Sequence, residues 1–228
     1  FYQGVIEVTM VFKKEDKIIT FSKVDLSTPL ENDSIPSSPN VIDIQRIAIP
    51  NGEYDFEISL KDKNTTKDAT IYKDKIVINH QQNVISISGI QLMNKVEPTK
   101  SPNLFTKHNY DMYPYISDFF PEKINTLTVY AEIYNTSIVY GDSSEYLYRI
   151  FVEDFESGRI VSQLFKMKKE TSSKVKPIIQ SFDISKLPSG NYNLVVEVRN
   201  KENKVDAFNK FFFQRSNPSV SNQSIDLT

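Results

Sequence analysis

The chain has 228 residues, with 27 basic and 29 acidic side chains and a formal net charge of −2. That balance excludes the basic surface expected of a nucleic-acid-binding protein and gives no polybasic attraction to an anionic membrane. The sequence contains no run of about 18 apolar residues, so it predicts no membrane-spanning helix. The absence of Cys excludes disulfides and thiolate chemistry.

Apolar and polar residues alternate through the first 80 residues with the period of two that is typical of half-buried strands. A loop over residues 27–40, rich in Pro, Ser and Asn, interrupts this pattern. We expect strands over residues 5–12, 18–26, 41–49, 53–61 and 70–78.

The same period continues in the rest of the chain, and no segment of ten or more residues has a helical period. Residues 110–121 are aromatic and contain Pro114 and Pro121, so they predict an edge strand at best. We expect further strands over residues 84–93, 126–134, 146–153, 159–166, 176–184, 191–199 and 205–213.

A turn of the form Pro-x-Gly-x-Tyr occurs twice, ending at Tyr54 and at Tyr192, with an offset of 138 residues (192 minus 54). Each turn leads into the penultimate strand of its half, which resembles the tyrosine corner of immunoglobulin-like sandwiches, where the hydroxyl bonds to upstream backbone. An ordinary core tyrosine is the alternative for either position alone, and the repeat favours the corner. The sequence therefore predicts an all-β fold of two tandem immunoglobulin-like or fibronectin-like sandwiches.

The repeat also predicts the domain boundaries. We expect a first sandwich over residues 1–82, a second over residues 83–216 and a polar tail or linker over residues 217–228. Counting 138 residues back from the strand at 84–93 leads to a position before Phe1, and the chain has no initiating Met. We therefore expect the N-terminal strand of the first sandwich to be missing.

Six short motifs follow one another in an order that resembles the N-terminal region of the GWxTD-domain proteins of Bacteroidota. The motifs are Tyr2-Gln3-Gly4-Val5, Ile49-Pro50-Asn51-Gly52-Glu53-Tyr54, Ile87-Ser88-Gly89-Ile90-Gln91-Leu92, Val129-Tyr130-Ala131-Glu132-Ile133-Tyr134-Asn135, Leu187-Pro188-Ser189-Gly190-Asn191-Tyr192 and Phe213-Gln214-Arg215-Ser216-Asn217-Pro218. The resemblance covers residues 1 to about 218. The motif that names the family is absent, because the chain has no Trp.

The resemblance implies an exported protein of the periplasm or the outer membrane, and it would permit a lipid anchor upstream of Phe1. It supplies no reaction mechanism. It also marks Ser34, within Asp33-Ser34-Ile35, as a hypothetical O-glycosylation site of the Bacteroidota type. An unmodified loop serine is the alternative.

The residues that enzymes and metal sites need do not occur in recognisable patterns. The two histidines, His80 and His108, have no second histidine at metal-binding spacing, so we interpret them as solvated loop or edge residues. There is no Gly-x-Ser-x-Gly elbow and no glycine-rich phosphate loop. We expect no catalytic residue, no metal and no cofactor, and a protein that is not an enzyme.

Aromatic side chains gather between residues 110 and 120, and Tyr113, Tyr115 and Phe119 are the candidate partner contacts. The alternative is that these rings fill the seam between the two sandwiches. We expect a scaffold module that docks with other envelope proteins, in an outer-membrane or secretion complex, through strand edges or aromatic anchors. A glycan-binding module of a polysaccharide-handling system is the second hypothesis, although the absence of Trp counts against it.

Overall fold

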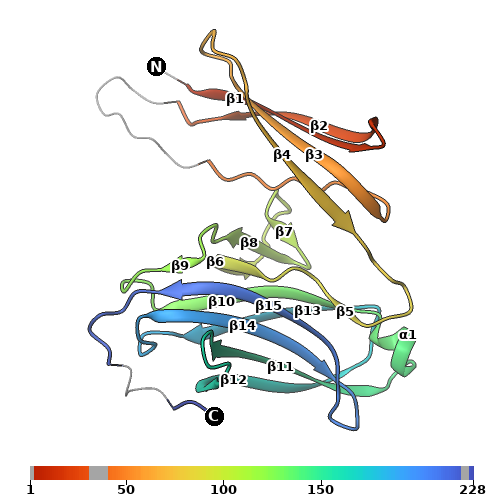
Figure 1. Cartoon of the computed structure of the whole chain (residues 1–228), viewed down its shortest axis with the longest axis vertical. Coiled ribbons are helices and arrows are strands. Elements are labelled where there is room, and N and C mark those ends of the chain that lie inside the picture. Colours follow the sequence, from red (N-terminus) through yellow and green to blue (C-terminus); the bar gives the residue numbers. More distant parts are fainter. Residues whose placement is uncertain (1–2, 31–40, 222–225) are drawn as a thin grey trace. The chain divides into compact units, whose positions relative to one another are not determined.

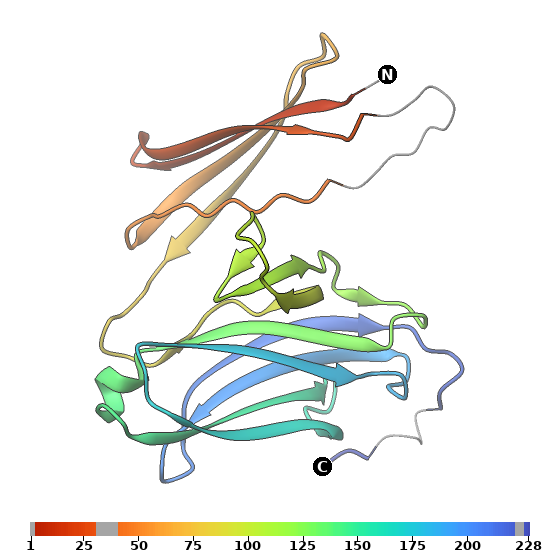
Figure 2. The same cartoon turned by 180° about the vertical axis from the view of Figure 1, so that it is seen from behind.

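The computed structural model describes residues 3–30, 41–221 and 226–228. The chain divides into two compact units, Phe1–His80 and Gln81–Thr228, and each is built mainly from antiparallel strands (Figures 1 and 2). The predicted all-β class is confirmed. The units divide two residues before the expected boundary at residue 82. Among the described residues, no helix has the length and apolar character to cross a membrane.

The first unit contains one four-stranded sheet in the order β2-β1-β3-β4. Its strands are β1 (Val5–Lys14), β2 (Lys17–Ser27), β3 (Gly52–Asp62) and β4 (Thr70–Ile78). β1 and β2 are joined through Glu15 and Asp16, which both have positive φ, as in a two-residue hairpin turn that matches strand twist. One face of the sheet is apolar, and Val8, Met10, Phe12 and Tyr54 are buried on it.

The prediction of a strand over residues 41–49 is wrong. These residues form no strand, although Ile47 and Ile49 pack against the apolar face of the sheet. Within 3–30 and 41–80 there is also no second sheet, so the described part of the first unit is one layer of the expected sandwich. The physical reason is that apolar alternation becomes a strand only where a neighbouring strand pairs with its backbone.

The second unit is a sandwich of two sheets. One runs β13-β10-β6-β8-β7, with β5 also pairing with β10, and the other runs β12-β11-β14-β15-β9. Its elements are β5 (Ser86–Ile87), β6 (Gln91–Pro98), β7 (Thr106–Lys107), β8 (Tyr110–Pro114), β9 (Phe119–Phe120), β10 (Thr126–Tyr134), α1 (Thr136–Tyr140), β11 (Glu145–Asp154), β12 (Ile160–Thr171), β13 (Val175–Asp183), β14 (Gly190–Arg199) and β15 (Val205–Arg215).

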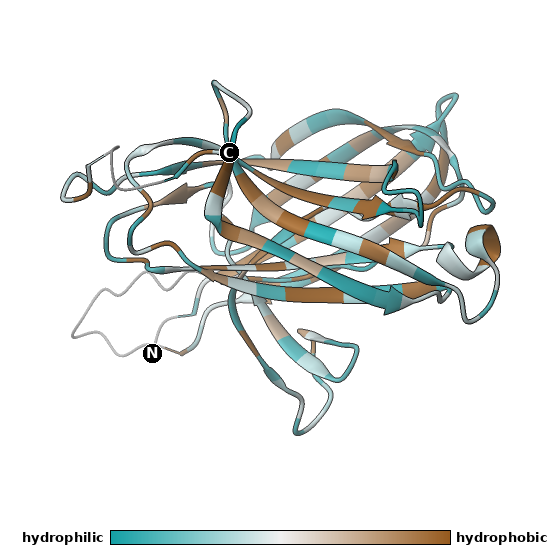
Figure 3. Ribbon diagram, turned by 90° about the horizontal axis from the view of Figure 1, so that it is seen from below, coloured by the Kyte–Doolittle hydropathy of each residue, from teal (hydrophilic) through white to brown (hydrophobic). Residues whose placement is uncertain are grey.

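The core of the second unit lies between these two sheets. Leu127, Val129 and Ile133 of β10 are fully buried against a cluster that includes Ile150 of β11 and Leu194 of β14. The side chains that enter this core come from alternate positions of β10, β11 and β14, and Figure 3 shows brown bands interspersed with teal ones along the strands. The period of two in the sequence therefore reports the inward face correctly.

Two predicted segments of the second unit differ in the structure. The strand expected over residues 84–93 is divided into β5 and β6. The end of the chain is not a free tail, because Ile160 and Thr228 exchange backbone hydrogen bonds of 2.8 and 2.9 Å and Ser162 donates to Asp226 at 2.9 Å. The sequence does not predict this pairing, because a few residues of any composition can form backbone hydrogen bonds with an open strand edge.

Candidate interaction surface

The two repeated tyrosines make the hydrogen bonds that the sequence predicts. The Tyr54 hydroxyl donates to the Pro50 carbonyl at 2.8 Å, and the Tyr192 hydroxyl donates to the Pro188 carbonyl at 3.2 Å. A Cβ atom at Gly52 would lie 3.2 Å from the tyrosine hydroxyl oxygen, and so would a Cβ atom at Gly190. Glycine therefore allows each ring to lie against its own turn.

The repeat extends from these turns to whole sheets. The strand order β2-β1-β3-β4 of the first unit matches β12-β11-β14-β15 of the second, and all of these neighbours are antiparallel. Tyr54 lies opposite Ile76, as Tyr192 lies opposite Phe213. The two units are therefore built on the same four-stranded sheet, which only the second unit covers with another sheet in the described part of the chain.

The three candidate contact residues do not form a single platform. The Tyr113 ring lies 4.7 Å from that of Phe105, and the Tyr115 ring lies 4.8 Å from that of Phe120. The Tyr115 hydroxyl also donates to the Phe119 carbonyl at 2.6 Å, which fixes Tyr115 at the margin of the core. Phe119 is 43% exposed, so it is the one of the three whose ring is most accessible.

A groove of about 500 Å³ lies beside these residues. Leu92, Tyr115 and Phe211 line it with apolar surface, and Ile116 at its rim is 77% exposed. Asp118 adds a carboxylate. Because these residues come from β6, from the segment between β8 and β9, and from β15, the groove opens between the two sheets of the second unit.

One wall of the groove is a strand edge that is only partly used. β9 pairs with β15 in parallel at Gln214 and Arg215, where Gln214 donates its N–H to the Asp118 carbonyl at 2.7 Å. Backbone groups alternate in direction along a strand, so the N–H groups of Phe212 and Lys210 point to the same edge. We call the stretch from Lys210 to Phe212 the β15 window, because no described strand pairs with this edge there.

Asn209 closes the far end of the window. Its Oδ1 accepts the N–H of Lys210 at 2.8 Å, and its Nδ2 donates to the Ser88 carbonyl at 2.8 Å. The window is therefore bounded by Asn209, which occupies the Lys210 N–H, and by β9, and it offers the N–H of Phe212 to an added strand.

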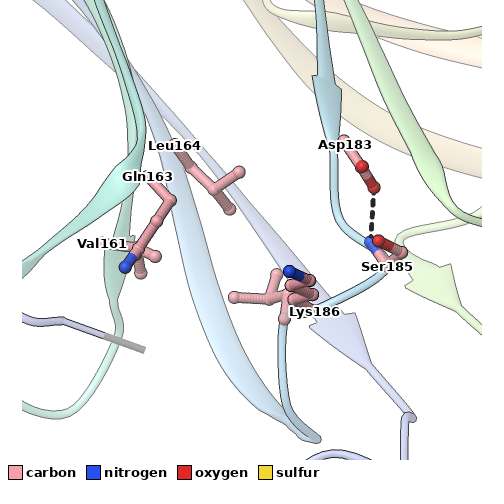
Figure 4. Close-up of a pocket in the computed structure, with 7 residues that line it drawn as sticks. Val161, Gln163, Leu164, Asp183, Ser185 and Lys186 are labelled. Atoms are coloured by element: carbon pink, nitrogen blue, oxygen red, sulfur yellow. Dashed lines mark hydrogen bonds between the residues drawn. The ribbon is translucent and has the colours of Figure 1, made fainter. Parts of the chain in front are cut away.

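A second cleft, of about 390 Å³, opens on the opposite side of the sandwich. Figure 4 shows Val161 and Leu164 of β12 on one side and Asp183, Ser185 and Lys186 on the other. Ser185 donates its N–H to Asp183 at 2.9 Å, and hydrogen bonding from Ser185 lowers the pKa of Asp183. This carboxylate is held in its ionised form, which does not suit a general acid at neutral pH.

A charged cluster lies on the outward face of β10. The Glu132 carboxylate accepts hydrogen bonds from His108 Nε2 at 2.6 Å and from the Tyr130 hydroxyl at 2.6 Å, and it pairs with Lys107 Nζ at 3.0 Å. The Tyr134 hydroxyl donates to its other oxygen. Burial alone raises the pKa of Glu132, but these donors outweigh burial and lower the pKa from 4.5 to about 2.

His108 is exposed in a turn, as the sequence predicts, but its contact with Glu132 was not predicted. His108 and Asn109 form the turn between β7 and β8, both with positive φ, and the imidazole reaches back to Glu132 on β10. The cluster is an ionic clamp that holds the β7–β8 hairpin on β10. The alternation Tyr130-x-Glu132-x-Tyr134 is the sequence signal that could have indicated it, since three polar groups then share one face.

Two further expectations from the sequence concern Ser34 and metal binding. Ser34, the hypothetical O-glycosylation site, lies outside the described residues. Within residues 3–30, 41–221 and 226–228, no three side chains of the metal-binding types gather where they could hold an ion.

Comparisons with known proteins supply no family. No family model matches the chain, and no curated protein matches it. Among solved structures, a β-glucosidase from Kluyveromyces marxianus in complex with glucose is similar over 57% of this chain and 13% of its own, at 10% identity and a TM-score of 0.27. A selenomethionine-labelled form of that enzyme is similar over 55% of this chain and 15% of its own, at 9% identity and a TM-score of 0.24. The chain thus spans a small part of these enzymes, and similarity at this level carries no argument about function.

Proposed function

We propose that the second unit is a docking module that binds an extended segment of a partner protein by strand addition at the β15 window. The observation that carries the proposal is the combination of an apolar groove with an open strand edge along its wall. Backbone hydrogen bonds to such an edge supply affinity, and a pocket beside it selects the side chain of the added strand.

The dimensions of the window define the ligand. Lys210 to Phe212 is a short stretch, so the added segment pairs over a few residues and needs apolar anchoring as well. Leu92, Tyr115 and Phe211 provide that anchoring inside the groove, while Ile116 and Phe119 are exposed. The partner segment is therefore extended, with an apolar side chain directed into the groove.

The place of action in this proposal comes from the resemblance of the sequence motifs to the GWxTD-domain proteins. On that basis the partner is a protein of the cell envelope, as part of an outer-membrane or secretion assembly, and the module acts as a scaffold rather than as an enzyme.

Site-specific photo-crosslinking in the native cells tests the proposal. A photoreactive amino acid replaces Phe119, which directly follows the groove-lining residues Ser117 and Asp118, or, as the control, Phe208, which is 62% exposed on β15 and has no groove-lining residue next to it in the chain. We expect position 119 to give a discrete adduct with an envelope protein and position 208 to give none. Ile116→Glu should abolish the adduct, because it places a charge at the groove.

The outcomes separate the hypotheses. Equal adducts from both positions, or no adduct from position 119, would contradict docking at the groove. Binding of polysaccharides that is weakened by Phe119→Glu, without any protein adduct, would replace the proposal by the glycan-binding hypothesis.

A further inference from the structure

The apolar face of the first unit's sheet is covered only in part by the residues described. Ile47 and Ile49 pack beside Val8, Phe12 and Tyr54. Toward the other end of the same face, however, Ile6 is 45% exposed and Leu60 is 42% exposed. These two side chains share the face because Val8 pairs with Leu60 and lies two residues from Ile6.

The second unit shows how a second sheet covers the same four-stranded sheet. β10 pairs with β13 in one continuous antiparallel register, from Thr126 opposite Asp183 to Tyr134 opposite Val175. The inward residues of β10 bury completely against the four-stranded sheet. They are Leu127, Val129, Ala131 and Ile133, each 0% exposed.

The repeat identifies the counterpart of β13 in the first unit. The offset of 138 residues (192 minus 54) places Val41 on Ile179 and Gln45 on Asp183. Residues 41–45 make no backbone hydrogen bond to another described residue, and they lie in no strand. Ile42 and Ile44 are only half-buried there. These residues have the apolar alternation of β13 but lack its partner, β10.

We propose that residues 41–45 are an acceptor edge, and that the first unit binds an added β-strand of the β10 type, which pairs antiparallel with this edge and covers the apolar face. In the register of β10 on β13, apolar residues of the added strand lie opposite Ile42 and Ile44. The proposal concerns a different unit and a different face from the docking groove, so neither proposal depends on the other.

The kind of segment that binds follows from two features of the first unit: the unpaired backbone of residues 41–45 and the partly covered apolar face of the sheet. The backbone of residues 41–45, which makes no hydrogen bond to the described chain, is satisfied by a strand that supplies N–H and C=O groups at the required spacing. A half-covered apolar sheet face is satisfied by side chains at alternate positions. A helix would cover the face but would leave the edge unpaired.

The test uses the whole chain and a labelled synthetic peptide with the sequence of β10, Thr126 to Tyr134, carrying terminal lysines for solubility. We expect saturable binding by fluorescence anisotropy and at least about tenfold slower amide hydrogen exchange at residues 41–45, as expected when edge groups become hydrogen-bonded. Ile44→Lys should abolish both effects. The matched control is Phe21→Lys, on the opposite face of the sheet, where Phe21 is 66% exposed and pairs with Val11.

Hydrogen exchange at β1 is measured in the same samples to check that the sheet stays folded. If Ile44→Lys speeds exchange at β1, Ile42→Lys is used in its place. Absence of peptide binding to the wild-type chain, or binding that Ile44→Lys and Ile42→Lys leave unchanged, would overturn the proposal. Protection of residues 41–45 that rises with chain concentration in the absence of peptide would identify a second copy as the occupant, and would also overturn it.

Discussion

At the scale of single residues, the hydroxyl groups of Tyr54 and Tyr192 each tie a strand to the turn that precedes it. Replacing either tyrosine by Phe leaves a proline carbonyl without its donor. We expect each change to lower the free energy of unfolding by about 1 kcal/mol, the usual net value of such a hydrogen bond. Urea denaturation, read separately for the two units by hydrogen exchange, measures the loss.

Tyr72 is the matched control for this prediction. Its hydroxyl donates to Asp74 at 3.1 Å on the surface, where Tyr72 is 59% exposed. Tyr72→Phe should change stability very little, because water replaces the lost partner. Equal effects of all three substitutions would show that the two repeated tyrosines are not special anchors.

At the scale of elements, the Glu132 clamp joins the β7–β8 turn to β10 and makes the stability of the second unit depend on pH. The folded pKa of Glu132, about 2, lies below its ordinary value of 4.5. The stabilisation is therefore fully present above pH 4.5 and is lost as the pH falls from 4.5 toward 2. Thermal unfolding followed between pH 7 and pH 2 measures this dependence.

Replacing the Glu132 carboxylate should remove both the clamp and the pH dependence of stability that it causes. Glu132→Gln should lower stability at pH 7 by about 1–3 kcal/mol, since charged hydrogen bonds are lost in a buried site. It should also flatten the acid limb of the curve. Glu202→Gln is the control, because that side chain is 72% exposed beside Lys204. An unchanged acid limb in Glu132→Gln would exclude Glu132 as its source.

The sequence predicts strand positions correctly where two conditions hold: apolar and polar residues alternate, and a neighbouring strand of the chain pairs with the backbone. β10 begins and ends at Thr126 and Tyr134, as the alternation predicts, because β6 and β13 pair with it on both sides. Residues 41–49 have comparable alternation and form no strand. The sequence records which side chains face inward, but it does not record whether a neighbouring backbone is present.

The candidate site was predictable only in part, for a similar reason. Aromatic clustering indicated the region that lies next to the groove, yet Tyr115 is fixed against Phe120 while Phe119 is exposed. The groove depends on Leu92 and Phe211, which are distant in sequence and meet only through the sheet arrangement. The Glu132–His108 pair likewise depends on a turn that brings two strands together.

At the scale of the whole molecule, one four-stranded sheet occurs twice, with the same strand order and the same tyrosine turn. In the second unit it is covered by a second sheet through β10 and β13. In the first unit the described residues provide no second sheet. The account therefore places one acceptor edge in each unit, at the β15 window and at residues 41–45.

Residue-resolved hydrogen exchange of the unliganded chain tests this account most directly. We predict slow exchange across Val175–Asp183, which pairs with β10, and exchange near the intrinsic rate at residues 41–45. In β15, the amide of Phe213 should exchange slowly and that of Phe212 rapidly. Protection of residues 41–45 equal to that of Val175–Asp183 would contradict the account, because it would show that the first unit already has its covering strand.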